Sequence, residues 1–137
     1  MRQRPIILLT RLVLVCTLIL LPACRNSLDD RAEQEARDYT TKFCPTPVYN
    51  YSRTDSLTFD RASRTFIYHC SLIGLMDSME IISQHRQELS EGLLKAISAS
   101  TQLKKYKDAG YNFRYLVHSS KNPQQVLFDK TYTQKDY

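Results

Sequence analysis

The chain has 137 residues, with 19 lysine and arginine side chains, 14 aspartate and glutamate side chains and a formal net charge of +5. Three of the basic residues and none of the acidic ones lie in the first 23 positions, which leaves 16 basic and 14 acidic side chains in the rest. A charge this small and mixed argues against a nucleic-acid partner, which would need a basic stripe or patch. The length suffices for one domain.

The first 23 residues have the three parts of a secretory signal. The only charges are positive, an unbroken apolar stretch begins at Leu12, and a short boundary follows at Pro22 and Ala23. The apolar stretch is too short to span a bilayer, which needs about 20 apolar residues. We therefore expect residues 1–23 to be a signal peptide and residues 24–137 to form a single small α+β domain.

The boundary residues favour one of two kinds of cleavage. The ordinary signal peptidase prefers small residues at −3 and −1, and a cut after Ala23 would put the bulky Leu21 at −3. Leu21, Ala23 and Cys24 instead have the spacing of a lipobox. Residues 1–24 thus resemble bacterial lipoproteins with a type II signal peptide, and residues 27–30 loosely resemble the export signal of small Bacteroidetes-type lipoproteins. A cysteine in a plain signal peptide or an uncleaved anchor is the alternative.

The resemblance implies that Cys24 is the lipidation site and the first residue of the mature protein. Two or three acyl chains make a lasting anchor, whereas one holds a protein only marginally. Arg25 at +2 is not the Asp that retains lipoproteins at the inner membrane of enteric bacteria. The implied location is therefore the outer membrane of the cell envelope, on its periplasmic or surface-exposed side.

Two cysteines remain in the domain itself, Cys44 and Cys70. An even pair in an oxidising compartment predicts a disulfide, which would restrict the unfolded chain by roughly 3.5 kcal/mol in the chain-entropy model. Two buried free thiols are the alternative, because free cysteine is often buried.

The domain reads as helix, hairpin, helix, hairpin. Apolar spacing predicts helices over residues 27–43 and 77–97, and alternating patterns predict hairpins over residues 48–73 and 111–132. Because hairpins pair antiparallel neighbours and striped helices need one apolar face to cover, we expect an αββαββ fold of the α+β class. Its four-stranded antiparallel sheet would carry helices on one face.

Strand alternation divides the sheet into two predicted faces. The face under the helices would hold mostly aromatic and aliphatic residues: Phe66, Tyr68, Cys70, Leu72, Tyr111, Phe113, Tyr115, Val117, Val126 and Phe128. The other face would hold the candidate interaction residues Ile67, His69, Arg114, Leu116, His118, Leu127 and Asp129. His85 lies on the apolar stripe of the second helix and is expected to be a packed core residue.

Three interpretations of the second face remain open: a solvated surface, a metal site or a docking surface. Two histidines and an aspartate could bind a metal, but they lack the close spacing of zinc ligands, so we expect no metal. No hydrolase elbow, phosphate loop or HExxH motif occurs in the sequence, and we expect neither enzymatic activity nor a cofactor. Exposed apolar residues on this face would favour docking.

The leading hypothesis is a small non-enzymatic envelope lipoprotein that acts as a binding or accessory module for another envelope protein. Its partners would be the membrane, through the lipid, and an envelope protein of unknown identity, but no nucleic acid. The alternatives are a small-ligand or carbohydrate-binding lipoprotein and a purely structural envelope component. Tyr49, Tyr51 and Tyr137 lie off the predicted core faces and are candidates for contact.

Overall fold

The computed structural model describes residues 23–137, with side chains from residue 28 onward. The chain divides into two compact units, Met1–Arg31 and Ala32–Tyr137, and the second contains the whole sheet. The predicted signal peptide lies outside the described residues except for its last position, as does the side chain of Cys24. Among the described residues, no helix is both long enough and apolar enough to cross a membrane.

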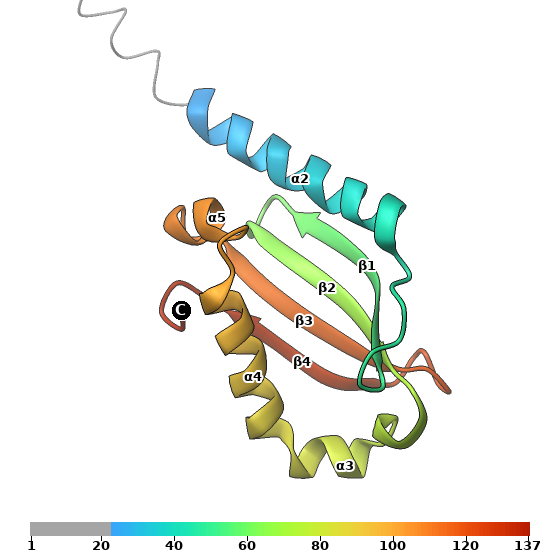
Figure 1. The fold of residues 1–137 in the computed structure, drawn as a ribbon. Coiled ribbons are helices and arrows are strands. Elements are labelled where there is room, and N and C mark those ends of the chain that lie inside the picture. Colours follow the sequence, from blue (N-terminus) through green and yellow to red (C-terminus); the bar gives the residue numbers. More distant parts are fainter. Residues whose placement is uncertain (1–22) are drawn as a thin grey trace, which may run out of the picture. The chain divides into compact units, whose positions relative to one another are not determined.

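Four strands and four α-helices, with one 3-10 turn, make up the described chain (Figure 1). In chain order they are α2 (Ala23–Phe43), β1 (Ser52–Asp60), β2 (Thr65–Leu72), η1 (Gly74–Met76), α3 (Met79–Gln84), α4 (Arg86–Ala99), α5 (Lys104–Asp108), β3 (Asn112–Ser119) and β4 (Val126–Tyr132).

The strands lie in the order β1-β2-β3-β4 and form one mixed sheet. β1 with β2 and β3 with β4 are antiparallel, but the central pair of β2 and β3 is parallel. The predicted purely antiparallel sheet is therefore wrong. The long connection through α3, α4 and α5 explains the difference, because a helical crossover returns the chain to the same end of the sheet and lets the next strand run parallel.

The predicted second helix is interrupted. Ser78 caps α3 by accepting a hydrogen bond from the backbone N–H of Ile81 at 3.5 Å. His85, with φ −107° and ψ 14°, ends α3 and separates it from α4. The side chain of His85 is 56% exposed and lies 3.2 Å from Glu88, so the prediction of a core histidine is wrong.

Helices cover one face of the sheet, and the core lies beneath them. The part of α2 in the second unit buries Ala32 and Ala36, and Thr40 donates a hydrogen bond from Oγ1 to the carbonyl of Leu57 at 2.8 Å. Under α5 lies an aromatic cluster in which Phe66 stacks on Phe113, with ring centroids 5.9 Å apart. An aromatic pair of this kind contributes about 1 kcal/mol of stability beyond the contribution from burying its surface area.

A bulge rearranges the start of β4. The register shifts between Val117 and His118, so Val117 lies opposite Phe128 while His118 lies opposite Val126. Leu127, the extra residue, is only 2% exposed and belongs to the core, whereas Val126 is 40% exposed. The predicted faces of these two residues are therefore wrong, because a bulge inserts one residue and breaks the alternation that the prediction assumed.

Candidate functional site

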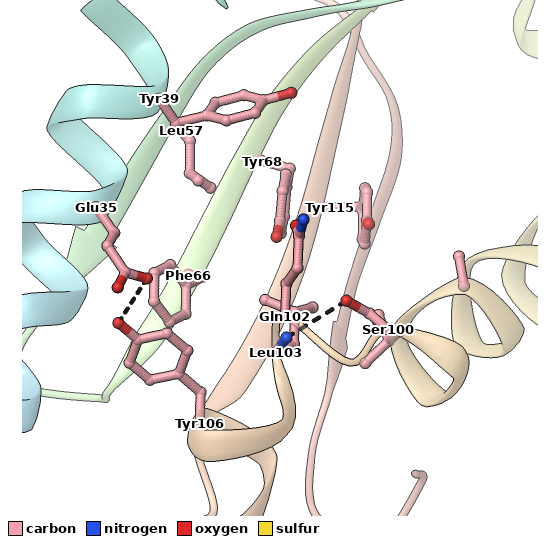
Figure 2. Close-up of a pocket in the computed structure, with 12 residues that line it drawn as sticks. Glu35, Tyr39, Leu57, Phe66, Tyr68, Ser100, Gln102, Leu103, Tyr106 and Tyr115 are labelled. Carbon is pink, nitrogen blue, oxygen red and sulfur yellow. Dashed lines mark hydrogen bonds between the residues drawn. The ribbon is translucent and has the colours of Figure 1, made fainter.

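An apolar groove lies on the helix side of the sheet, where α2 and α4 diverge (Figure 1). Its first hollow, of about 350 Å³, has a floor of strand residues and walls from α2, α4, α5 and the turn between the last two (Figure 2). The lining residues are Glu35, Tyr39, Leu57, Phe66, Tyr68, Ala96, Ile97, Ser100, Gln102, Leu103, Tyr106 and Tyr115.

Two tyrosines form the centre of this floor. Tyr68 of β2 and Tyr115 of β3 are direct partners in the parallel register, and their rings stack at 4.7 Å with an angle of 9° between the planes. Burial raises the pKa of Tyr68 to about 12 and also raises the pKa of Tyr115. Neither hydroxyl makes a hydrogen bond to any residue that the structure describes. The stack is therefore a neutral, mainly apolar surface with two hydroxyls that could hydrogen-bond an occupant.

The wall at the α5 end of the hollow is fixed by one carboxylate. Glu35 of α2 accepts a hydrogen bond from the Tyr106 hydroxyl at 2.9 Å, which Figure 2 shows. It also forms an ion pair with Lys105 at 2.5 Å. Tyr106 itself is almost fully buried. These contacts join α2 to α5 and hold that side of the groove in place.

A second hollow, of about 660 Å³, lies between α3, α4 and the loop before β1. Its lining is mostly apolar and includes Leu72, Met76, Ile82, Leu89 and Leu93. Leu89 and Leu93 also pack, together with Tyr68 and Tyr115, against the core cluster that includes Cys70 and Val117. We call the two hollows with these half-buried residues the helix-side groove.

Gly92 of α4 opens part of this groove. It lines the second hollow, and a Cβ built on it would meet no atom within 4 Å. Glycine inside a helix costs roughly 1 kcal/mol relative to alanine. At this position the missing side chain leaves space for an occupant of the groove.

The opposite face of the sheet holds most of the predicted interaction residues. Arg114 makes two hydrogen bonds to Asp129, at 2.8 and 2.6 Å, which raise the pKa of Arg114 and lower that of Asp129. The hydroxyl of Thr58 lies 3.0 Å from Nε2 of His69. Ile67, Leu116 and His118 are half-buried on the same face, and only Leu127 has left it.

This open face does not assemble a metal site. Among the described residues, no group of three or more His, Cys, Asp or Glu side chains could hold a metal ion. Burial, with the charges of His118 and Arg114, lowers the pKa of His69, while Asp55 opposes the shift. Nδ1 of His118 is buried without a hydrogen-bond partner in the described chain. The face is an ion-paired surface in which most polar groups bind each other.

The predicted disulfide is not supported. Cys44 and Cys70 are both free thiols, Cys44 half-buried after α2 and Cys70 buried in β2. Burial raises the pKa of Cys70 to about 11 and also raises that of Cys44, so both thiols are protonated at neutral pH. A protonated, buried thiol is inert and packs like a small apolar side chain.

The sequence pattern did not predict the groove, because it placed Tyr68 and Tyr115 on a sheet face that was expected to be fully covered by the helices. Alternation correctly placed both residues under the helices, but it could not show that α2 and α4 diverge above them. The nine tyrosines of the chain were the available signal. A half-buried Tyr with a free hydroxyl suits a surface that is apolar in one part and wet in another.

Comparison with family models decides the classification. A sequence model for a domain family matches residues 27–128, most of the chain. The chain belongs to the family described as Domain of unknown function (DUF8479). Its matched region begins after the predicted lipidation site and includes every strand except the end of β4. Among curated proteins, none matches this sequence.

Solved structures share the fold of this family member at low sequence identity. A protein of Pseudomonas aeruginosa described as secreted has a TM-score of 0.69 and 14% identity, over 80% of this chain and 92% of its own. The pilotin EpsS of the Vibrio vulnificus type 2 secretion system has a TM-score of 0.60 and 13% identity, over 81% and 92%. The pilotin AspS of the Vibrio cholerae type II secretion system has 0.61 and 13%, over 82% and 94%. The likeness concerns the fold.

Proposed function

We propose that this protein is a non-enzymatic accessory lipoprotein of the cell envelope, and that its helix-side groove binds a segment of another envelope protein. The observation that carries the proposal is the groove itself, whose apolar floor of Tyr68 and Tyr115 is only partly covered by the helices. An amphipathic segment is the occupant that suits such a surface, since its apolar face would cover the floor and its polar face would stay in water.

The fold supports an accessory role. Two pilotins of secretion systems share the architecture over more than nine-tenths of their own length. The groove lacks the features of an active site. In the first hollow, burial holds Tyr68 and Tyr115 neutral, and Glu35 is already bonded to Tyr106 and Lys105. In the second hollow, His85 and Glu88 are exposed and lie 3.2 Å from each other. Binding without chemistry is the activity that these side chains fit.

The membrane side of the proposal rests on Cys24. Cleavage before this residue and lipidation of its sulfur would anchor the domain, with the outer membrane as the proposed location. A Cys24→Ser variant should lose fatty-acid labelling and be released from the membrane fraction. Labelling that persists in this variant would contradict the assignment of the lipid site.

The groove can be tested without weakening the fold. Gly92→Arg would fill the second hollow while replacing a poor helix former with a good one. The full-length lipidated variant, crosslinked in intact cells, should lose the envelope protein that the original chain captures, and its thermal unfolding should be undiminished.

Ala99→Arg is the matched control. It adds the same side chain to an exposed position at the end of the same helix that lines neither hollow. Capture should survive in this variant. Equal capture by both arginine variants would exclude the groove as the binding site.

A small ligand is the second candidate, favoured by the size of the first hollow. Its volume of about 350 Å³ is near the lower end for ligand pockets, and the Tyr68 and Tyr115 hydroxyls could hydrogen-bond a ligand. Paired Tyr68→Phe and Tyr115→Phe substitutions remove those hydroxyls and keep the packing. A protein partner that binds through apolar contact should tolerate the pair, whereas a sugar-like ligand should not.

A further inference from the structure

An uncharged, apolar tip lies beside the groove, at the end of the sheet where β1 begins. Two short segments build it, the loop between α2 and β1 and the turn that follows β2. Its exposed apolar or aromatic side chains are Val48 at 53%, Tyr49 at 77%, Tyr51 at 48% and Leu75 at 73%. The other large hydrophobic side chains exposed in the described chain are Phe43 at the end of α2, Met79 at the start of α3 and Val126 in β4.

The tip is held in shape by backbone bonds. Tyr49 and Ser52 exchange two hydrogen bonds, at 2.9 and 3.0 Å, around a tight turn, and Ile73 donates from its N–H to the carbonyl of Tyr51 at 2.8 Å. The two segments are thereby joined directly. The apolar side chains accordingly project from an ordered surface.

The turn keeps a tyrosine where glycine would be the usual residue. Asn50 and Tyr51 both have positive φ, at 46° and 61°, as in the tight hairpin turns that favour Asn-Gly. A bulky residue in this region costs roughly 1–3 kcal/mol. The Tyr51 ring lies against Gly74, where an added Cβ would be 3.4 Å from Cδ1 of the ring and where φ is +65°. Strain of this kind is typical of a functional surface.

The two segments of the tip carry no charge, although Asp77 directly follows the second. Residues 43–52 and 70–76 contain no charged side chain, although about a quarter of the whole chain is charged. Lys42 and Arg53 flank the first segment, and each lies near an acidic neighbour, Asp38 at 3.7 Å and Asp55 at 2.7 Å. The tip is thus an electrically neutral, amphipathic surface.

We propose that the apolar tip inserts into the lipid headgroup region, as a second membrane contact in addition to the lipid at Cys24. Protruding aromatic and aliphatic side chains on turns fit the interface of a bilayer, where Tyr buries its ring and keeps its hydroxyl in water. Tyr49 also lines the second hollow of the groove, whereas Val48, Tyr51 and Leu75 line neither hollow and point to a separate contact. The absence of charge fits zwitterionic lipid.

This inference rests on the proposed anchor. A few partly exposed apolar side chains bind a membrane weakly on their own, but a lipid on the same chain makes the second contact intramolecular and raises its effective concentration. Together the two contacts would hold the domain at a defined face, and the groove beside the tip would open near the membrane surface.

The chain contains no tryptophan, so a single introduced Trp reports one position. We would place Leu75→Trp in the tip and Ala62→Trp in the exposed turn at the opposite end of β1 as the control. Full-length lipidated protein is then reconstituted into phosphatidylcholine vesicles. Emission from the tip Trp should shift to shorter wavelength and be quenched by lipids with brominated acyl chains, at low and high salt alike, while the control Trp should stay water-exposed.

The outcomes separate the two proposals. Flotation of both variants with vesicles reports the anchor, so failure to float would contradict the anchor and the tip contact together. Flotation with a tip Trp as water-exposed as the control would overturn the tip contact alone. Shielding of the tip Trp only when the crosslinked envelope protein is added would assign the tip to a protein interface and also overturn the lipid contact.

Discussion

The two faces of the sheet differ in how their side chains are satisfied. On the open face, Arg114 pairs with Asp129 and His69 lies against Thr58, so most polar groups have partners within the chain. On the helix side, the Tyr68 and Tyr115 stack is only partly covered by the helices, and its hydroxyls bind no described residue. One face is largely complete, and the other is an apolar surface that a further segment could cover. Burial and pairing thus locate the candidate site better than residue type alone.

The largest expected difference between the faces concerns stability. Phe113→Ala removes a fully buried ring from the aromatic core and should lower the free energy of unfolding by about 3–5 kcal/mol. Leu116→Ala, on the open side of the same strand, should cost about 1 kcal/mol because Leu116 is only half-buried. Denaturant titration measures the free energy of unfolding of both variants. Equal losses would mean that side chains on the open face contribute as much to stability as those on the helix side.

A smaller effect is expected from the ion pair of the open face. Asp129→Asn removes the charge that pairs with Arg114, and both side chains are roughly two-fifths exposed. Solvent screening limits the loss to about 0.5–1 kcal/mol. High salt should shrink the difference between variant and original protein. A loss that is several times larger, or independent of salt, would show that this face is more strongly coupled than its exposure indicates.

The smallest effect is a pH dependence centred on His69. His118 and Arg114 of β3 face it, as do Asp55 and Thr58 of β1, and burial lowers its pKa below the usual 6.5. The unfolded chain therefore binds this proton more readily, so stability should be full above pH 6.5 and should fall as the pH drops toward the folded pKa. His69→Gln should flatten this part of the stability profile. An unchanged profile would assign the pH dependence to other groups.

Local patterns predicted much of the fold. The helix before the first strand, the four strands and the inward positions of Phe66, Phe113 and Val117 follow from apolar spacing alone. The parallel pairing of β2 and β3 did not follow, because local patterns do not specify how two strand pairs join across a helical crossover. The bulge that buries Leu127 was likewise invisible, since one inserted residue changes register without changing composition.

The site was less predictable than the fold. Alternation could assign Tyr68 and Tyr115 to the helix side, but their partial exposure depends on the angle at which α2 and α4 leave the sheet. The open-face candidates were chosen because they combine polar and apolar residues, and pairing between Arg114 and Asp129 makes that face less available than expected. Tyr49 and Tyr51, by contrast, were correctly predicted to lie outside the core.

In-cell photo-crosslinking from the two faces of the sheet would show which face binds the envelope protein. A photoreactive amino acid would replace Tyr39, on the α2 wall of the groove, or Thr131, exposed on the open face, in the full-length lipidated protein. We expect a discrete crosslinked envelope protein from position 39 and none from position 131, and we expect the product to be lost when Gly92→Arg is added. A product from position 131 alone, or from position 39 whether or not Gly92 is replaced, would contradict this expectation.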